Sequence, residues 1–338
     1  MPVTLTFHDS QYPACLAEQL CQGLRARKLP GKFLYESPAQ AQRWLAYHQA
    51  YSPSRTEPAL LVLYDQAFQA ALQALSPSAL HYVSLGCGGG NKDALFLQQA
   101  ALHCPSLVFT PIDTSAALVV ETMLRIQSAL PLLTTAPLVV DLDVAPVLTP
   151  WLSQYETPTH RRLLSCFGML PNFAYQTFLS YVRSLMRPGD MLLLSANLSP
   201  GLYADAVRRI LPQYDNPLGR AWYAGLLDSL GFTASQVQLT VYPHLLQPDG
   251  HIWQIRAEAT VQQQMQLTVY NEMFSFTTGE SLEVFFSNRF TPQVMPQILA
   301  DAGLTLVQTW LFDSQEEAIY LCSNSSGDSK ASIEDPRA

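Results

Sequence analysis

The chain has 338 residues, of which 48% are hydrophobic and 14% are charged, which suits a folded core and excludes a disordered chain. Its length fits two domains or one enlarged domain. The 19 Lys and Arg residues against 27 Asp and Glu give a formal net charge of −8 with no basic block, so we expect no nucleic-acid or membrane partner.

The first half of the chain alternates between helical and strand-like patterns. Apolar residues at helical spacing over 60–75 predict a helix, and the short apolar run at 81–85 predicts a strand. The pattern then repeats, with strands expected at 106–112, 137–142, 162–167 and 191–196 and helices at 92–102, 115–130 and 173–186. Strands that alternate with helices predict a parallel sheet with right-handed crossovers.

The alternation changes from about residue 199. Helices are expected at 203–211 and 219–230, followed by antiparallel strands at 237–242, 252–261 and 267–276. The last helix is expected at 293–302, and the strands at 305–311 and 318–322 form a predicted hairpin. The fold class is thus α/β, and a parallel sheet closed by a C-terminal antiparallel hairpin is usual in Rossmann-like class I methyltransferases. The polar stretch 324–338 is predicted to be a disordered tail.

Cysteine, histidine and N-terminal patterns argue against several other classes. The six cysteines form no C-x-x-C pair and the seven histidines no H-x-x-x-H spacing, so we expect reduced thiols and no metal site. The first residues lack a basic segment followed by an apolar one, and no apolar run approaches the ~20 residues that span a bilayer. We therefore expect a cytoplasmic protein, and since nothing indicates an interface, a monomer.

The clearest chemical motif is LGCGGG at residues 85–90, between an expected strand and an expected helix. Glycines here allow a tight turn and let a ligand lie against backbone N–H groups at a helix N-terminus. The spacing is G-x-G-x-G, because Asn91 stands where the dinucleotide fingerprint has its third glycine. The alternative is a tight turn with no ligand.

Two acids at strand ends favour a nucleoside ligand. Asp113 is placed to accept hydrogen bonds from ribose hydroxyls, and Asp141 from an adenine amino group. Each acid alone could instead cap the following helix. Both acids together with the glycine loop favour S-adenosylmethionine over a nicotinamide, although a nicotinamide oxidoreductase remains an alternative.

Further motifs resemble the histidine-specific Nα-methyltransferases of ergothioneine biosynthesis, from about residue 32 to residue 322. The matching segments are KFLYE at 32–36, YSPSRTE at 51–57, LGCG at 85–88, Asp113, GMLPNF at 168–173, RPGD at 187–190, YD at 214–215 and SNRF at 287–290. The resemblance implies transfer of methyl groups from S-adenosylmethionine to the α-amino group of a free amino acid, up to the trimethyl betaine, with S-adenosylhomocysteine as the other product.

The resemblance also implies a domain division and a set of site residues. Residues 58–199 and 284–323 would form the cofactor domain, and residues 1–57 and 200–283 a discontinuous α+β substrate domain. The implied cofactor contacts are Gly86, Cys87, Gly88, Lys92, Asp113, Asp141 and Leu142. The implied substrate contacts are Tyr51, Asn172 and Tyr214, which position the substrate without a dedicated catalytic base.

Each of these three also has a purely structural interpretation. Tyr51 could be a core aromatic residue, Tyr214 a loop aromatic residue, and Asn172 the N-cap of a helix that begins at Phe173. We take substrate binding as the stronger hypothesis for all three.

The substrate pocket departs from the family pattern. The family recognises imidazole with a Glu two positions before the serine that corresponds to Ser287, where this chain has Phe285, although Glu283 lies nearby. A pocket Met is replaced by Gln254. Phe cannot replace a charge-assisted hydrogen bond, so the pocket should be more apolar or recognise its ligand through Gln254.

The predicted function is therefore N-methylation of histidine or a histidine-like aromatic amino acid. Tryptophan, tyrosine or a modified relative is the alternative substrate, and a non-catalytic S-adenosylmethionine sensor is the alternative function. Ser84 also stands where many methyltransferases carry an acid.

Overall fold

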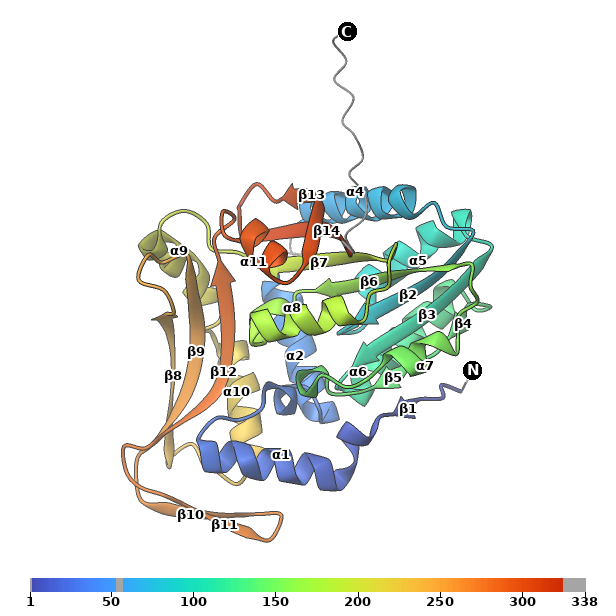
Figure 1. Cartoon of the computed structure of the whole chain (residues 1–338). Helices are drawn as coiled ribbons and strands as arrows, with labels where there is room; N and C mark the ends of the chain where they lie inside the picture. The colour runs from blue at the N-terminus through green and yellow to red at the C-terminus, as the bar shows by residue number, and fades with distance from the viewer. Residues whose placement is uncertain (1, 53–56, 325–338) are drawn as a thin grey trace.

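A computed structural model describes residues 2–52 and 57–324, and its centre is a nine-stranded sheet (Figure 1). The strands run in the order β1-β5-β3-β2-β6-β7-β14-β13, and the short β4 pairs with β3. The bounds are β1 Thr6–Phe7, β2 Ala79–Leu85, β3 Ser106–Asp113, β4 Thr134–Thr135, β5 Leu138–Val139, β6 His160–Phe167, β7 Met191–Asn197, β13 Leu304–Leu311 and β14 Glu317–Asn324.

The predicted fold class is confirmed by the pairing of these strands. β2 is parallel to β3 and β6, β6 is parallel to β7, and β14 is antiparallel to both β7 and β13. All seven residues of β2 are buried, because helices cover both faces of a parallel sheet. Leu80 and Tyr82 pack toward α4 and α5, while Val83 and Leu85 pack toward α8 and α11.

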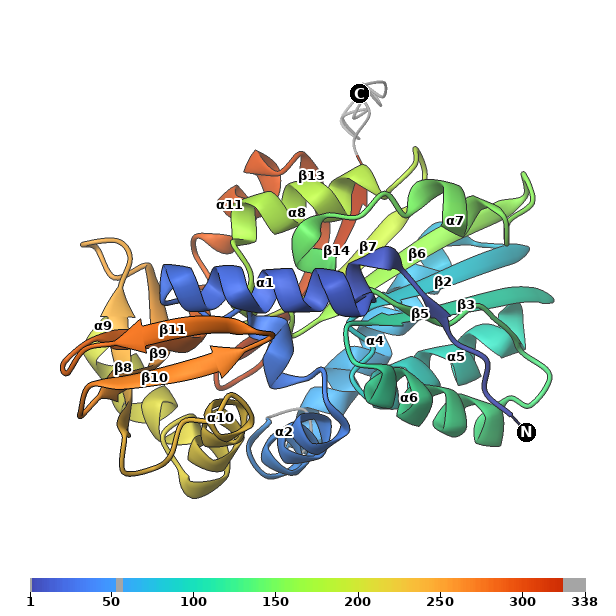
Figure 2. The same cartoon turned by 90° about the horizontal axis from the view of Figure 1, so that it is seen from below.

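The helices form a layer on each face of this sheet and a separate group beside it (Figures 1 and 2). The bounds are α1 Pro13–Ala26, α2 Pro38–Tyr51, α4 Pro58–Leu75, α5 Asn91–His103, α6 Ala116–Ala129, α7 Thr149–Ser153, α8 Tyr175–Ser184, α9 Tyr203–Ile210, α10 Pro217–Ser229 and α11 Met295–Asp301.

A second sheet lies beside the first and has its own hydrophobic core. β9 (Ile252–Val261) is its middle strand, antiparallel to β8 (Val237–Leu245) and β12 (Ser281–Phe290). Helices α1, α2, α9 and α10 contribute side chains to the core around this sheet. Figure 2 shows α2 and α10 side by side and α1 lying next to the hairpin of β10 and β11.

Several expected boundaries are wrong. The strand expected at 267–276 is a hairpin, β10 Met265–Val269 and β11 Glu272–Phe276, because Tyr270 and Asn271 both have positive φ and form a two-residue turn. The strand expected at 137–142 shortens to β5, since Asp141 caps a 3-10 turn. Helices α1 and α2 and strand β12 were not predicted.

Strand pairing crosses the domain division that the sequence analysis predicts. The boundary cuts through β12, whose backbone pairs with β9 over its whole length, so residues 284–290 belong to the small sheet. β1, from the segment assigned to the substrate domain, pairs with β5 in the large sheet. Asn324 pairs with Leu304 and is therefore the last residue of β14, and residues 325–338 of the expected tail lie outside the described residues.

A buried ionic network lies near the N-terminal ends of the inner strands β2 and β6, which are the ends away from the glycine loop. The Glu156 carboxylate contacts His81 at 2.7 Å, Arg162 at 2.9 Å and Arg187 at 2.7 Å. Burial alone would raise the pKa of Glu156, but hydrogen bonds from His81 and Arg162 outweigh it and lower the pKa to about 2. Because the unfolded chain takes up this proton first, Glu156 stabilises the fold above its ordinary pKa of 4.5, and this stabilisation is lost between there and about pH 2.

We expect Glu156→Gln to lower the free energy of unfolding at pH 7 by about 3–5 kcal/mol, because it leaves buried Arg162 without a counter-ion. Thermal unfolding at pH 7 and pH 3 measures the effect, and the difference in stability between the two pH values should shrink in the variant. Glu18→Gln is the control, since that carboxylate makes exposed contacts with Arg25 and Gln22. An unchanged melting temperature for Glu156→Gln would contradict the proposed role of the network.

Candidate active site

A cavity of about 750 Å³ lies at the carboxyl ends of the parallel strands, within the usual size range of small-molecule sites. Its lining comes from the glycine loop, the ends of β3 and β5, η4 (Leu170–Asn172), α2 and the edge strand β12. Open α/β sheets bind their ligands at this position. Of the predicted site residues, twelve line the cavity: Tyr51, Gly86, Cys87, Gly88, Lys92, Asp113, Asp141, Leu142, Asn172, Tyr214, Phe285 and Ser287.

The glycine loop has a backbone that only glycine adopts easily. Gly86, Gly88, Gly89 and Gly90 all have positive φ, and α5 begins directly afterwards at Asn91. A Cβ on Gly86 would lie 1.7 Å from the Met169 sulfur, so the loop touches the segment that leads into η4. Burial raises the pKa of Cys87 well above its ordinary value, and the nearby Asp113 carboxylate raises it further. This thiol therefore stays protonated.

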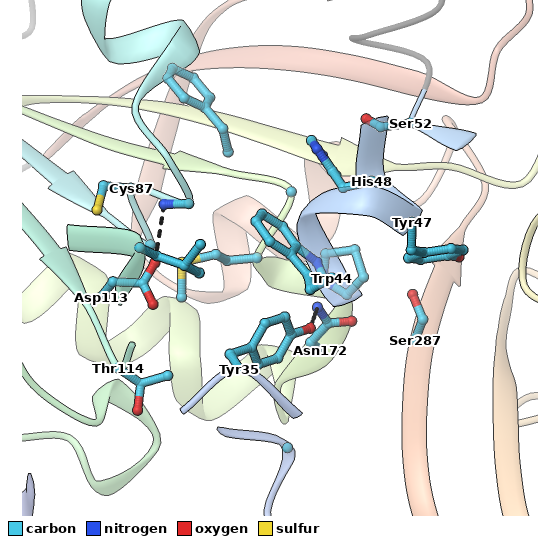
Figure 3. Close-up of a pocket in the computed structure, with 18 of the residues that line it drawn as sticks. Tyr35, Trp44, Tyr47, His48, Ser52, Cys87, Asp113, Thr114, Asn172 and Ser287 are labelled. Carbon is cyan, nitrogen blue, oxygen red and sulfur yellow. Dashed lines mark hydrogen bonds between the residues drawn. The ribbon is translucent and has the colours of Figure 1, made fainter. Parts of the chain in front are cut away.

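Asp113 connects the glycine loop to the start of α6. Its carboxylate accepts from the Gly88 N–H at 3.1 Å (Figure 3) and from the Ser115 N–H at 3.0 Å. The N-cap of α6 is Ser115, whose hydroxyl accepts from the Leu118 N–H, so capping does not explain Asp113. Burial raises the pKa of Asp113 to about 6 although the donors from Ser115 and Gly88 lower it, which leaves an ionised acceptor at neutral pH.

Asp141 has a cationic neighbour that the sequence did not indicate. One of its oxygens accepts from the Asp143 N–H at 3.0 Å, and the other lies 3.0 Å from the Lys32 ammonium. Asp141 therefore does cap the 3-10 turn, in line with its structural interpretation, and it also anchors the N-terminal segment at the cavity.

Lys92 places its ammonium beside a buried phenol and a carboxylate. It donates to the Tyr64 hydroxyl at 2.7 Å and lies 3.6 Å from Glu317, and Tyr64 itself donates to Glu317 at 2.5 Å. Tyr64 is fully buried, whereas Glu317 and Lys92 line the cavity. Lys92 thus brings a positive charge to a wall that otherwise carries a carboxylate.

Asn172 lies in η4 and lines the cavity. Its Nδ2 donates to the Tyr35 hydroxyl at 3.4 Å, and the two side chains face each other in Figure 3. Helix α8 begins at Tyr175 with Ala174 as its N-cap, so the N-cap interpretation of Asn172 is wrong. Tyr35 belongs to the KFLYE motif, but the sequence analysis does not predict it as a site residue. Its place in the cavity wall and its contact with Asn172 identify it as one.

The opposite wall combines a hydroxyl pair with aromatic rings. The Tyr214 hydroxyl lies 3.5 Å from the Ser287 hydroxyl, and the Tyr214 ring stacks on Phe285 at 5.9 Å between centroids. Phe285 also packs against Trp222 and Tyr223. Tyr51 lines the cavity from α2, its ring centroid 5.7 Å from that of Tyr47.

Gln254, predicted to contact the substrate, does not line the cavity. It lies on the middle strand β9, where it pairs with Asn288 of β12, and its amide bonds to Asn288 and Arg256 at 2.8 Å each. Glu283 does line the cavity, but Lys28 at 3.0 Å and Arg256 at 3.8 Å surround its carboxylate. The sequence could not show that Gln254 pairs with Asn288 and so points to the face of the sheet opposite Ser287.

The cavity fits the expected cofactor. The glycine cradle, which a Cβ would disrupt, leaves room for a ligand against backbone N–H groups, and Asp113 and Asp141 place carboxylate oxygens at the strand ends beside it. Within residues 2–52 and 57–324, no group of three or more His, Cys, Asp or Glu side chains is arranged to hold a metal ion.

Comparison with protein families decides the class. Residues 16–324 match the profile of the histidine-specific, S-adenosylmethionine-dependent methyltransferases. The chain belongs to this family. It is therefore an S-adenosylmethionine-dependent methyltransferase, and the expected resemblance, cofactor and enzyme class are confirmed.

Solved structures with a similar fold are distant in sequence. A methyltransferase from Clostridium acetobutylicum has 13% identity and a TM-score of 0.46, covering 83% of this chain and 98% of its own. The magnesium protoporphyrin IX methyltransferase from Synechocystis, solved with S-adenosylhomocysteine, has 14% identity and a TM-score of 0.45, covering 87% and 98%. No curated protein sequence matches the chain. Among the described helices, none has the length and apolar character to cross a membrane.

We expect Gly86→Ala to weaken S-adenosylhomocysteine binding at least ~10-fold, a free-energy change of about 1.4 kcal/mol, because the new methyl group must displace Met169. Titration calorimetry measures the affinity. Gly279→Ala is the matched control, since Gly279 also has positive φ but no atom within 4 Å of the position that a Cβ would take. If both variants lost the same affinity for S-adenosylhomocysteine, backbone strain alone would explain the effect.

Proposed function

We propose that this methyltransferase acts on the α-amino group of a free amino acid with an aromatic side chain, histidine or a larger ring. The observation that carries the proposal is one cavity in which polar anchors at Asn172, Tyr214 and Ser287 face an aromatic wall beside the glycine loop. The family match supports histidine, and the replacement of the family's acid by Phe285 supports a larger aromatic substrate.

The polar anchors have complementary hydrogen-bonding roles. The Asn172 amide donates through Nδ2 to Tyr35, which leaves its carbonyl oxygen as an acceptor for an amine N–H. The hydroxyls of Tyr214 and Ser287 are donors suited to a carboxylate. An amino acid held at both ends presents its amine in a fixed direction, which is the main requirement of an in-line transfer.

S-adenosylmethionine, when bound, supplies a methyl group activated on a sulfonium. The chain's own contribution is to bind a neutral amine, orient its lone pair and exclude water. Trp44 contributes to the enclosure, because its ring lies against the glycine loop, where a Cβ on Gly88 would be 3.1 Å from it. No strong base is required when the amine loses its proton to solvent before it binds.

Aromatic rings around the cavity also support formation of a betaine. Tyr35 packs edge-on against Trp44 and Trp222, at 5.8 Å and 5.3 Å between centroids, and all three rings line the cavity. Faces of aromatic rings attract quaternary ammonium groups. The cavity could therefore retain a partly methylated amine until three methyl groups are added.

We expect mass gains in methylene steps when the purified protein is incubated with S-adenosylmethionine and single amino acids. Mass spectrometry across the twenty standard amino acids is the measurement. A methylated product from histidine would support histidine as the substrate. A product from tryptophan or tyrosine would support a larger aromatic substrate that packs against Phe285. If S-adenosylhomocysteine binds and no amino acid gains mass, the proposal fails for standard amino acids.

Asn172→Ala separates an enzyme from a non-catalytic sensor. We expect it to raise KM for the amino acid about 10-fold or more through loss of the amine acceptor, with S-adenosylhomocysteine affinity within about twofold of the original. A sensor would show unchanged cofactor binding and no activity to lose. Thermal unfolding checks that the variant is folded.

A further inference from the structure

Buried cations in this protein are paired with carboxylates, with one exception. Among the described residues, the buried Lys and Arg side chains are Lys32, Arg162 and Arg289. Lys32 pairs with Asp141 at 3.0 Å, and Arg162 pairs with Glu156 at 2.9 Å. Arg289 is 2% exposed, and no carboxylate oxygen in residues 2–52 and 57–324 lies within 4.0 Å of its guanidinium. An uncompensated buried charge is costly, so its retention needs an explanation.

The groups that face Arg289 are neutral phenols. It donates through one terminal nitrogen to the Tyr214 hydroxyl, and its guanidinium carbon lies 4.9 Å from the Tyr214 ring centroid. Its Nε has no hydrogen-bond partner, and neither has the nearby Tyr223 hydroxyl. Burial raises the pKa values of Tyr47 and Tyr223 well above 10, although the Arg289 charge lowers them, so neither phenol supplies a negative charge at pH 7.

The contact with Arg289 determines how Tyr214 can bond. A guanidinium has only donors, so the Tyr214 oxygen accepts from it and the Tyr214 O–H remains available as a donor. Tyr214 lines the cavity while Arg289 lies behind it, and Ser287 offers a second hydroxyl 3.5 Å away. The cavity wall therefore presents hydroxyl donors backed by an unneutralised positive charge, which suits an anionic group of the ligand.

We infer that Arg289 is a positioning residue that selects acceptors with a free α-carboxylate, acting through the Tyr214 hydroxyl. The inference rests on the proposed function, because it takes the acceptor to be an amino acid. When the acceptor binds, its carboxylate supplies the counter-charge that Arg289 lacks. Amino-acid amides and decarboxylated amines have no such charge and bind weakly.

Calorimetric titration of the protein saturated with S-adenosylhomocysteine tests this inference. The probes are L-histidine and L-tryptophan, each against its amide. We expect each acid to bind about 10-fold or more tightly than its amide, and this preference to fall to about twofold or less in Arg289→Met. Arg289→Lys should retain most of the preference, because it keeps the charge. Arg220→Met is the matched control, since Arg220 is paired with Asp215 outside the cavity.

Three results separate the inference from its alternatives. Equal losses of acid and amide affinity in Arg289→Met would overturn it, because Arg289 would then only hold the Tyr214 ring. Equal affinity of acid and amide for the original protein would also overturn it. Binding of S-adenosylhomocysteine with no binding of any acid or amide would refute the proposed function.

The melting temperature of the ligand-free protein is a second readout that needs no acceptor. We expect Arg289→Met to melt at a higher temperature than Arg289→Lys, because both variants lose the guanidinium contacts with Tyr214 but only Arg289→Lys keeps the uncompensated charge. The reverse order would overturn the inference.

Discussion

The close approach of Gly86 to Met169 is the contact on which the site depends. It joins the glycine loop to the short segment that carries Asn172, and both line the cavity. Asp113 stabilises the same loop from β3 through the Gly88 N–H. A side chain at residue 86 would force these elements apart, so the spacing between the glycine loop and the Asn172 segment depends on the absence of a Cβ. Parallel strands supply this geometry because their carboxyl ends meet at one edge of the sheet.

The substrate side is assembled from segments far apart in the sequence. Helix α2 contributes Trp44, Tyr47 and Tyr51, and the edge strand β12 contributes Phe285 and Ser287. Lys32 connects the N-terminal segment to Asp141 after β5, so the same segment that brings Tyr35 to Asn172 also contacts the strand ends of the large sheet. Residues 32–35 therefore contact two parts of the cavity wall.

Charge is distributed unevenly around this cavity. Asp113 and Glu317 bring negative charge to the cofactor half, with Lys32 and Lys92 close by, and Glu283 is surrounded by Lys28 and Arg256. At the other end, Arg289 contacts the Tyr214 hydroxyl and ring, and no carboxylate oxygen among the residues that the structure describes lies within 4.0 Å of its guanidinium. A methyltransferase that binds a zwitterionic acceptor has to accommodate both of its charges while keeping the amine neutral for reaction. Neutral hydroxyl and amide groups near the amine avoid a carboxylate that would favour its protonated form.

Local pattern was enough to predict the large sheet, its hairpin, the glycine loop and the acids at strand ends. Each depends on periodicity or on the conformational freedom of glycine, which are properties of a few consecutive residues. The residues of the substrate side came from resemblance to a family, and the tertiary structure decided which of them share the cavity. The sequence predicts substrate contacts for both Gln254 and Phe285, yet only Phe285 lines the cavity. Gln254 lies on the inner strand β9 and pairs with Asn288, the residue after Ser287, so the side chains of Gln254 and Ser287 point to opposite faces of the sheet. The sequence likewise could not predict that buried Arg289 has no carboxylate within 4.0 Å among the described residues. Whether a charge is paired depends on contacts between residues that are distant along the chain.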